Sequence, residues 1–86
     1  MTVYLVDEAF LDIAFSYSAL DKDARVVLLQ DAVYYAVKGQ ARGEVYVVED
    51  DITRRGLKSM IHPSVHVIGY ADLVQMMERE RVINFL

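Results

Sequence analysis

Acidic side chains follow three of the apolar segments in this chain. Asp7 comes directly after the first segment, Asp31 after the second, and Asp50 and Asp51 after the third. If the segments are parallel strands, their carboxyl ends meet at the edge where open α/β sheets bind ligands, and carboxylates there could hold Mg²⁺ or present a phosphorylatable aspartate. The alternative is that each carboxylate caps the helix that follows it. We favour capping, because it explains all three positions without a shared site.

Few other residue types in the chain could do chemistry. The chain contains no cysteine, so by itself it can form no thiolate nucleophile, persulfide carrier, iron–sulfur cluster or cysteine-based zinc site. His62 and His66 are four positions apart, but Pro63 and Val65 argue against a helix that would place both on one face, so we expect a loop histidine and a strand histidine. The serines lack a nucleophile elbow, and the GQARG segment at 39–43 matches no phosphate-binding loop. We therefore expect no catalytic residue, no metal ligands and no cofactor.

A short basic run follows the third acidic group. It consists of Arg54, Arg55 and Lys58, and we expect Arg42 to lie near it. Most runs of this kind are a solvated helix face, and the alternative is a docking patch for an acidic partner or for RNA. The formal net charge of -4 disfavours unaided binding to nucleic acid, because such binding depends on neutralising phosphates. We therefore expect no direct contact with nucleic acid.

Repeated pairs of a strand and a helix position these residues. The stretch 26–37 contains an apolar strand, a turn at Gln30 and Asp31, and a short apolar helix. A strand that is apolar at every position must be covered on both faces, which is typical of a parallel sheet in an α/β protein. The expected strands are 3–6, 26–30, 45–48 and 65–68, and the expected helices are 9–18, 32–37, a short one ending near 56, and 71–81.

These units predict a three-layer α/β/α fold with a parallel four-stranded sheet built from right-handed βαβ units. The chain, 1–86, is expected to form a single domain, and the segment 82–86 is expected to be a short tail. No apolar run approaches the roughly 20 residues needed to cross a bilayer, and the N-terminus lacks the basic flank of a signal peptide. We expect a cytoplasmic protein that does not contact a membrane.

The helices expected at 9–18 and 32–37 are apolar nearly all round. A helix of this kind is normally buried on every side, yet a domain of this size has no second layer to cover the outer faces. The residues predicted to meet another subunit are Phe10, Phe15, Tyr17, Tyr34 and Tyr35. The alternative is that they fill a small aromatic core. We favour an oligomer, because exposed apolar patches of that size are uncommon on monomers.

Three motifs, in this order, resemble the TusB/DsrH family of sulfur-relay subunits. They are VVLLQDAV from Val26, VYVVEDDITRRGL at 45–57, and VIGYADLVQMM at 67–77. The resemblance implies an α/β subunit that assembles with DsrE- and DsrF-like (TusD- and TusC-like) subunits, or with itself. It also implies a complex that passes sulfane sulfur as a cysteine persulfide, either toward 2-thiouridine at the wobble position of tRNA or within sulfur oxidation.

The resemblance further implies which kind of subunit this is. The reactive cysteine of such complexes generally belongs to a partner, and members that carry one have it in the first helix, near the position of Ser16 in this chain. A hydroxyl cannot carry a persulfide, so the chain resembles the non-catalytic kind. The alternative function, from a different class, is a small signalling domain that binds metal or phosphate through Asp7, Asp31, Asp50 and Asp51.

Overall fold

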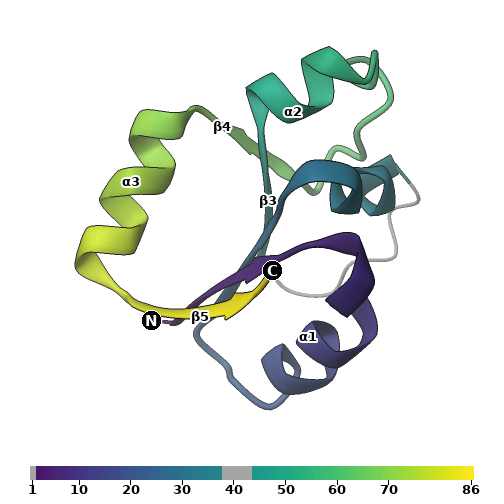
Figure 1. Ribbon diagram of the computed structural model, residues 1–86. Coiled ribbons are helices and arrows are strands. Elements are labelled where there is room, and N and C mark those ends of the chain that lie inside the picture. Colours follow the sequence, from purple (N-terminus) through teal and green to yellow (C-terminus); the bar gives the residue numbers. More distant parts are fainter. Residues whose placement is uncertain (1, 38–43) are drawn as a thin grey trace.

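The computed structural model describes residues 2–37 and 44–86 (Figure 1). Within these ranges one sheet contains five strands in the order β4-β3-β2-β1-β5, and all of its pairings are parallel. The strands are β1 (Thr2–Val6), β2 (Ala24–Leu28), β3 (Glu44–Val48), β4 (His66–Ile68) and β5 (Arg81–Phe85). The predicted α/β class with a parallel sheet is confirmed.

The predicted number of four strands is wrong, because the expected tail is a strand. β5 pairs with β1 over its whole length, from Thr2 opposite Arg81 to Val6 opposite Phe85. The last helix ends at Arg79 rather than Arg81, and Glu80 already has extended backbone angles. No glycine or proline marks this change of structure, so the segment could not be separated from the helix by turn signals.

The helical elements differ from the expected ones mainly in their geometry. They are η1 (Glu8–Phe10), α1 (Leu11–Ser18), η2 (Gln30–Val37), α2 (Glu49–Arg54) and α3 (Tyr70–Arg79), where η marks a 3₁₀ helix. The expected helix 9–18 therefore begins with a 3₁₀ turn, and the expected helix 32–37 is 3₁₀ throughout. At the start of η2 the amide of Ala32 donates to the carbonyl of Leu29, three residues earlier, at 3.0 Å.

Two hydrophobic clusters lie against opposite faces of the sheet. Successive side chains of a strand point to opposite faces, so Tyr4 and Val6 belong to one cluster and Val3 and Leu5 to the other. The first cluster includes side chains of α1, η2 and α2, and the second includes Leu73 of α3. Figure 1 shows α1 and α3 on opposite sides of the sheet. In the described ranges no helix is both long enough and apolar enough to span a membrane.

Candidate functional site at the carboxyl edge of the sheet

Asp51 is a buried carboxylate at the carboxyl edge of the sheet. It lies in the first turn of α2, directly after β3, and only 1% of its surface is exposed. Its Oδ2 accepts a hydrogen bond from the backbone amide of Gln30 at 3.3 Å, and its Oδ1 lies 3.8 Å from Nη1 of Arg55. Oδ1 is buried and forms no hydrogen bond with a described residue. Asp51 therefore links the segment after β3 to the segment after β2.

Gln30 is in the left-handed region of backbone conformation. Its φ is 52°, and no other non-glycine residue in the described ranges has a positive φ. This conformation costs about 1–2 kcal/mol for a residue with a Cβ. The hydrogen bond to Asp51 and the bond from the amide of Leu29 to the carbonyl of Val6, at 2.9 Å, hold the chain on both sides of the bend. The bend lets the chain leave β2 and enter η2 at once.

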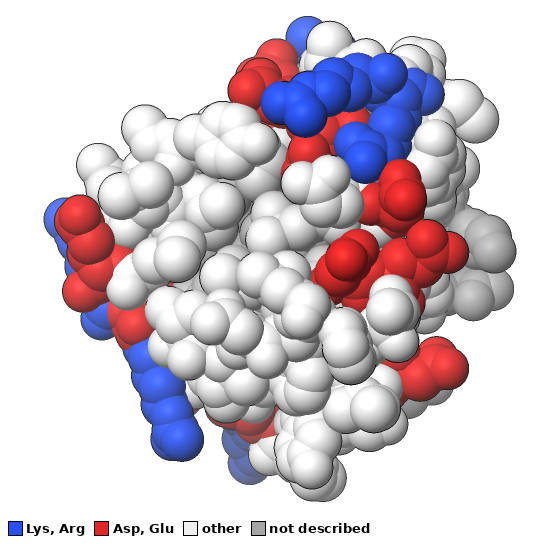
Figure 2. Space-filling model, in the orientation of Figure 1, with Lys and Arg blue, Asp and Glu red and all other residues white. Residues whose placement is uncertain are grey.

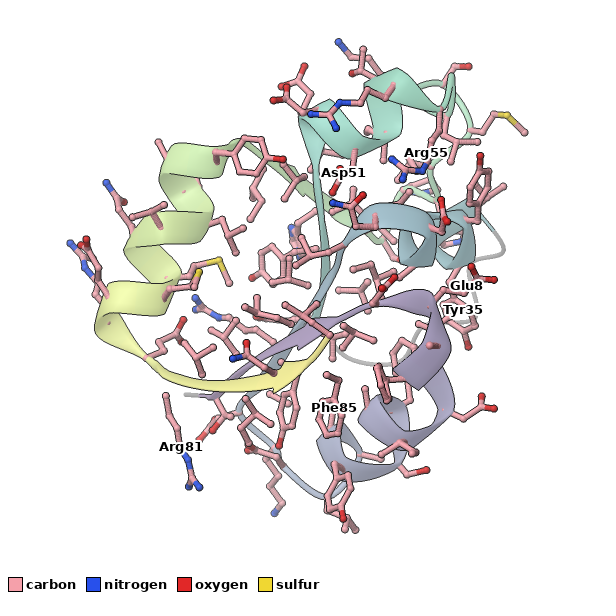
Figure 3. All side chains as sticks on the ribbon, in the orientation of Figure 1. Glu8, Tyr35, Asp51, Arg55, Arg81 and Phe85 are labelled. Atoms are coloured by element: carbon pink, nitrogen blue, oxygen red, sulfur yellow. The ribbon has the colours of Figure 1, made fainter. Side chains whose placement is uncertain are left out.

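Arg55 lies near two carboxylates that come from different elements, and Figure 3 shows it beside one of them, Asp51. Its Nε and Nη2 both lie 3.1 Å from Oδ1 of Asp31 in η2. Its Nη1 donates to the backbone carbonyl of Asp51 at 3.0 Å, and only 17% of the Arg55 side chain is exposed. The guanidinium therefore fastens α2 to η2.

Three of the four aspartates proposed as a metal or phosphate site have separate roles, and the fourth, Asp50, is exposed. Asp7 accepts a hydrogen bond from the amide of Glu8 at 2.7 Å and caps η1, as the capping interpretation expects. Asp31 and Asp51 bind Arg55 instead, and α2 has no side-chain cap. Figure 2 shows acidic side chains gathered on this face beside basic ones. Among the described residues, no group of three or more His, Cys, Asp or Glu side chains is arranged to hold a metal ion.

The predicted docking patch contains residues with unlike surroundings. Arg42 lies outside the described residues. Arg54 is exposed on α2, whereas Arg55 is occupied by Asp31, and Nζ of Lys58 lies 3.2 Å from Oε1 of Glu49. Arg54 and Lys58 are thus both exposed, whereas Arg55 is largely covered. The patch as a docking surface stays a prediction.

The predicted subunit interface divides into packed and exposed aromatic residues. Phe15 and Tyr35 pack on the first cluster with their ring centroids 5.0 Å apart. Phe10, Tyr17 and Tyr34 are exposed, with 37%, 58% and 48% of their surfaces accessible. The first two residues are therefore partly buried against the core, and the other three are exposed; the subunit interface stays a prediction.

The two histidines are in separate environments, as expected. His62 lies in the loop before β4, with its Nδ1 2.7 Å from Oγ of Ser64. His66 is in β4 and stacks on Tyr46, with ring centroids 4.8 Å apart. Their different partners agree with the reading of one loop histidine and one strand histidine.

Known proteins resemble this chain in both sequence and fold. The family model described as DsrH like protein matches residues 10–82. The chain belongs to the DsrH-like family. Protein TusB of Erwinia tasmaniensis is 39% identical to it over 62 residues, and the match covers 63% of this chain and 65% of that protein. The chain thus matches slightly less than two thirds of the length of this curated relative.

The fold of this DsrH-like chain also occurs in a solved structure. The crystal structure of the ychN protein from E. coli superposes with a TM-score of 0.76, and the match covers 98% of this chain and 97% of the ychN chain. The two sequences are 17% identical, so the likeness concerns the fold alone. The similarity to the TusB/DsrH family expected from the three motifs is confirmed.

Two features of this DsrH-like chain were missed in the sequence. The sequence did not indicate that Gln30 adopts a left-handed conformation, since asparagine and glycine are the residues expected there. Arg25 in β2 was missed as well: its Nε lies 3.3 Å from Glu44 and its Nη1 3.2 Å from Glu80, beside a surface pocket under α3. A charged residue at the start of an apolar strand gives no indication of its partners, because Glu80 is far away in the sequence.

Proposed function

We propose that this chain is a non-catalytic subunit of a cytoplasmic sulfur-transfer complex. The complex serves either 2-thiolation of the tRNA wobble uridine or sulfur oxidation. The observation that carries the proposal is membership of the DsrH-like family in a chain that has no cysteine. In a persulfide relay, an acceptor thiolate attacks the outer sulfur of a donor persulfide, a new S–S bond forms, and the donor leaves as a thiolate. Cysteines of partner subunits must supply both groups.

The surroundings of Ser16 agree with a role that involves no chemistry. Ser16 stands near the position where the resemblance places a cysteine in other members. Its Oγ donates to the backbone carbonyl of Asp12, one helical turn earlier, at 2.9 Å. No histidine, lysine or arginine bonds to this hydroxyl among the described residues. The side chain is therefore occupied within α1 and is not activated as a nucleophile.

The exposed aromatic residues are the proposed contact with partner subunits. Phe10 precedes α1, Tyr17 lies near its end, and Tyr34 lies in η2. Half-exposed aromatic rings are typical anchors of protein interfaces, because they bury a large area at a small entropic cost. We propose that they meet a DsrE- or DsrF-like subunit that bears the reactive cysteine, with exposed Arg54 as a further contact.

The test is a sulfur-transfer assay with purified components. A cysteine desulfurase charged with ³⁵S-cysteine is mixed with a DsrE-like partner from the same organism, with and without this chain. We expect the label on the partner alone, a complex of both proteins on size exclusion, and faster loading of the partner when the chain is present. Tyr17→Ser should weaken the complex, whereas Met60→Ser, at an exposed loop position, should not. A chain that neither binds such partners nor changes the rate would contradict the proposal.

A further inference from the structure

The outer edge of β5 is unprotected. β5 pairs with β1 on one side and ends the sheet on the other (Figure 1). It has five residues, RVINF, without proline or glycine, and three of them favour strands. The opposite edge, β4, has only three residues and begins shortly after Pro63, which is how proteins usually shorten or block an edge. An unblocked edge presents free backbone donors and acceptors to another strand.

The backbone groups that face outward belong to Val82 and Asn84. The carbonyl of Phe85 accepts from the amide of Asp7 at 3.0 Å, so the backbone groups of Phe85 face the β1 side. These directions alternate along a strand, and therefore Arg81 and Ile83 also face β1, whereas Val82 and Asn84 face away from it. An added strand would thus pair with Val82 and Asn84.

On one face of β5, a positively charged side chain precedes the central residue by two positions and an aromatic ring follows it by two positions. Phe85 stacks on Tyr4 and on Tyr17, with ring centroids 6.3 Å and 5.8 Å apart. Arg81 and Ile83 are on the same face as Phe85, because side chains two positions apart share a face. Figure 3 shows Arg81 and Phe85 at opposite ends of β5. Ile83 therefore has a positive charge two residues before it and a ring two residues after it.

We propose that β5 pairs antiparallel with β5 of a second copy of this chain, about a two-fold axis at Ile83. In this register Val82 and Asn84 exchange backbone hydrogen bonds with Asn84 and Val82 of the second copy. Ile83 faces its own copy, and Arg81 faces the ring of Phe85. Both facing pairs are of the close, non-hydrogen-bonded type, which brings the guanidinium of Arg81 next to the ring of Phe85.

We assign the edge of β5 to a second copy of the chain, because two antiparallel β5 strands complement each other. The two-fold axis forms the contact between cation and ring twice, and it satisfies the outward backbone groups of Val82 and Asn84 in both copies. Leu86, which is 59% exposed, directly follows β5 and adds apolar area to the strand pair. Such flanking area is needed, because a stable interface buries roughly 1,200 Å² or more in total. The inference concerns contacts between copies and does not rest on the sulfur-transfer role.

Single cysteines test the register, since the chain has none of its own. Close antiparallel pairs have Cα atoms about 4.5 Å apart, a distance that a disulfide can bridge. Under mild oxidation with diamide, Ile83→Cys should form a covalent dimer at least ten times faster than Asn84→Cys. In the proposed register two copies of residue 84 are not opposite each other and lie too far apart for a disulfide. Equal rates, or no dimer from either variant, would overturn the proposal.

A second variant tests the backbone pairing at the edge of β5 and leaves the side chains on the Ile83 face unchanged. Asn84→Pro removes an outward amide, a change that an edge strand tolerates, and Met60→Ser alters an exposed side chain in the loop before β4. By light scattering at roughly 0.1–1 mM, where a dimer with a Kd of about 0.1 mM is well populated, we expect a dimer for the parent and for Met60→Ser and a monomer for Asn84→Pro. The proposal is wrong if the parent is a monomer, if Asn84→Pro remains a dimer, or if only a DsrE-like partner pairs with this edge.

Discussion

The buried carboxylate of Asp51 lies 3.3 Å from the backbone amide of Gln30, the one described non-glycine residue with a positive φ. Asp51 lies in α2 and Gln30 begins η2, the helical elements that follow the neighbouring strands β3 and β2. A strained bend and a buried charge are each costly alone, and here each one stabilises the other. Because Arg55 binds both Asp51 and Asp31, the same contacts hold η2 and α2 together.

Replacing Asp51 should destabilise the fold strongly. Asp51→Ala leaves the amide of Gln30 without its acceptor and removes the carboxylate that lies 3.8 Å from the Arg55 guanidinium, and we expect a loss of about 3 kcal/mol in the free energy of unfolding. Asp51→Asn keeps an acceptor for the amide and should lose less. Urea denaturation measures both, with exposed Asp50→Ala as the control expected within about 0.5 kcal/mol of the parent. A similarly small change for Asp51→Ala would show that the carboxylate does not hold the bend.

Gln30→Gly should preserve or raise stability, in contrast to most substitutions by glycine. Glycine adopts a positive φ without strain, and the relief of about 1 kcal/mol offsets the greater entropy of the unfolded chain. Gln30→Val should lose more than 1 kcal/mol, because a β-branched residue fits this conformation poorly. Thermal denaturation compares them, with Ser59→Gly as a control that should show the usual loss. If Gln30→Gly lost as much as Ser59→Gly, the left-handed conformation would not be a source of strain.

The two groups of aromatic residues should respond differently to truncation. Phe15→Ala removes a ring that packs on Tyr35 and the first cluster, so we expect a loss of about 3 kcal/mol in stability. Tyr34→Ser, at a half-exposed position, should change stability by less than about 0.5 kcal/mol and act on binding to a partner subunit. Denaturation and titration calorimetry separate the two effects. The division into packed and exposed aromatic residues would be contradicted if Tyr34→Ser destabilised the isolated chain as much as Phe15→Ala.

Stability should fall at alkaline pH because of two tyrosines. Burial, followed by the nearby carboxylate of Asp21, raises the pKa of Tyr4 above its ordinary value of 10.0. Burial, followed by the hydrogen bond to Glu44, raises the pKa of Tyr46 in the same way. The unfolded chain then loses these protons first, so rising pH favours unfolding. The contribution is complete below pH 10 and is lost as pH rises through the folded-state pKa values.

Urea denaturation at pH 8.5–11, roughly the range that spans the ordinary pKa of tyrosine, measures this effect. We expect the decline above pH 10 to be shallower in Tyr4→Phe than in the parent, and shallower still when Tyr46→Phe is added. The phenylalanine variants lose the hydrogen bonds to Asp21 and Glu44, so their stability at pH 8.5 serves as the baseline. Parallel curves for all three proteins would exclude the two tyrosines as the cause.

The sequence by itself determined the fold class and the family. Apolar runs such as that at 26–28 require cover on both faces, and this requirement depends on residue type alone, so the parallel sheet and the first four strands could be predicted. The three motifs were sufficient to identify the family, because they depend only on short runs of residue types and on their order along the chain. The absence of cysteine excluded persulfide chemistry in this chain without any structure.

Only the tertiary structure decided the pairings between residues distant in sequence. β5 is a strand because β1 offers it an edge, and Asp51 is buried because the bend at Gln30 lies beside it. The division of the aromatic residues into packed Phe15 and exposed Tyr34 likewise depends on how α1 and η2 lie on the sheet. A residue's type limits the contacts it can form, but the choice of partner depends on which segments the fold brings together.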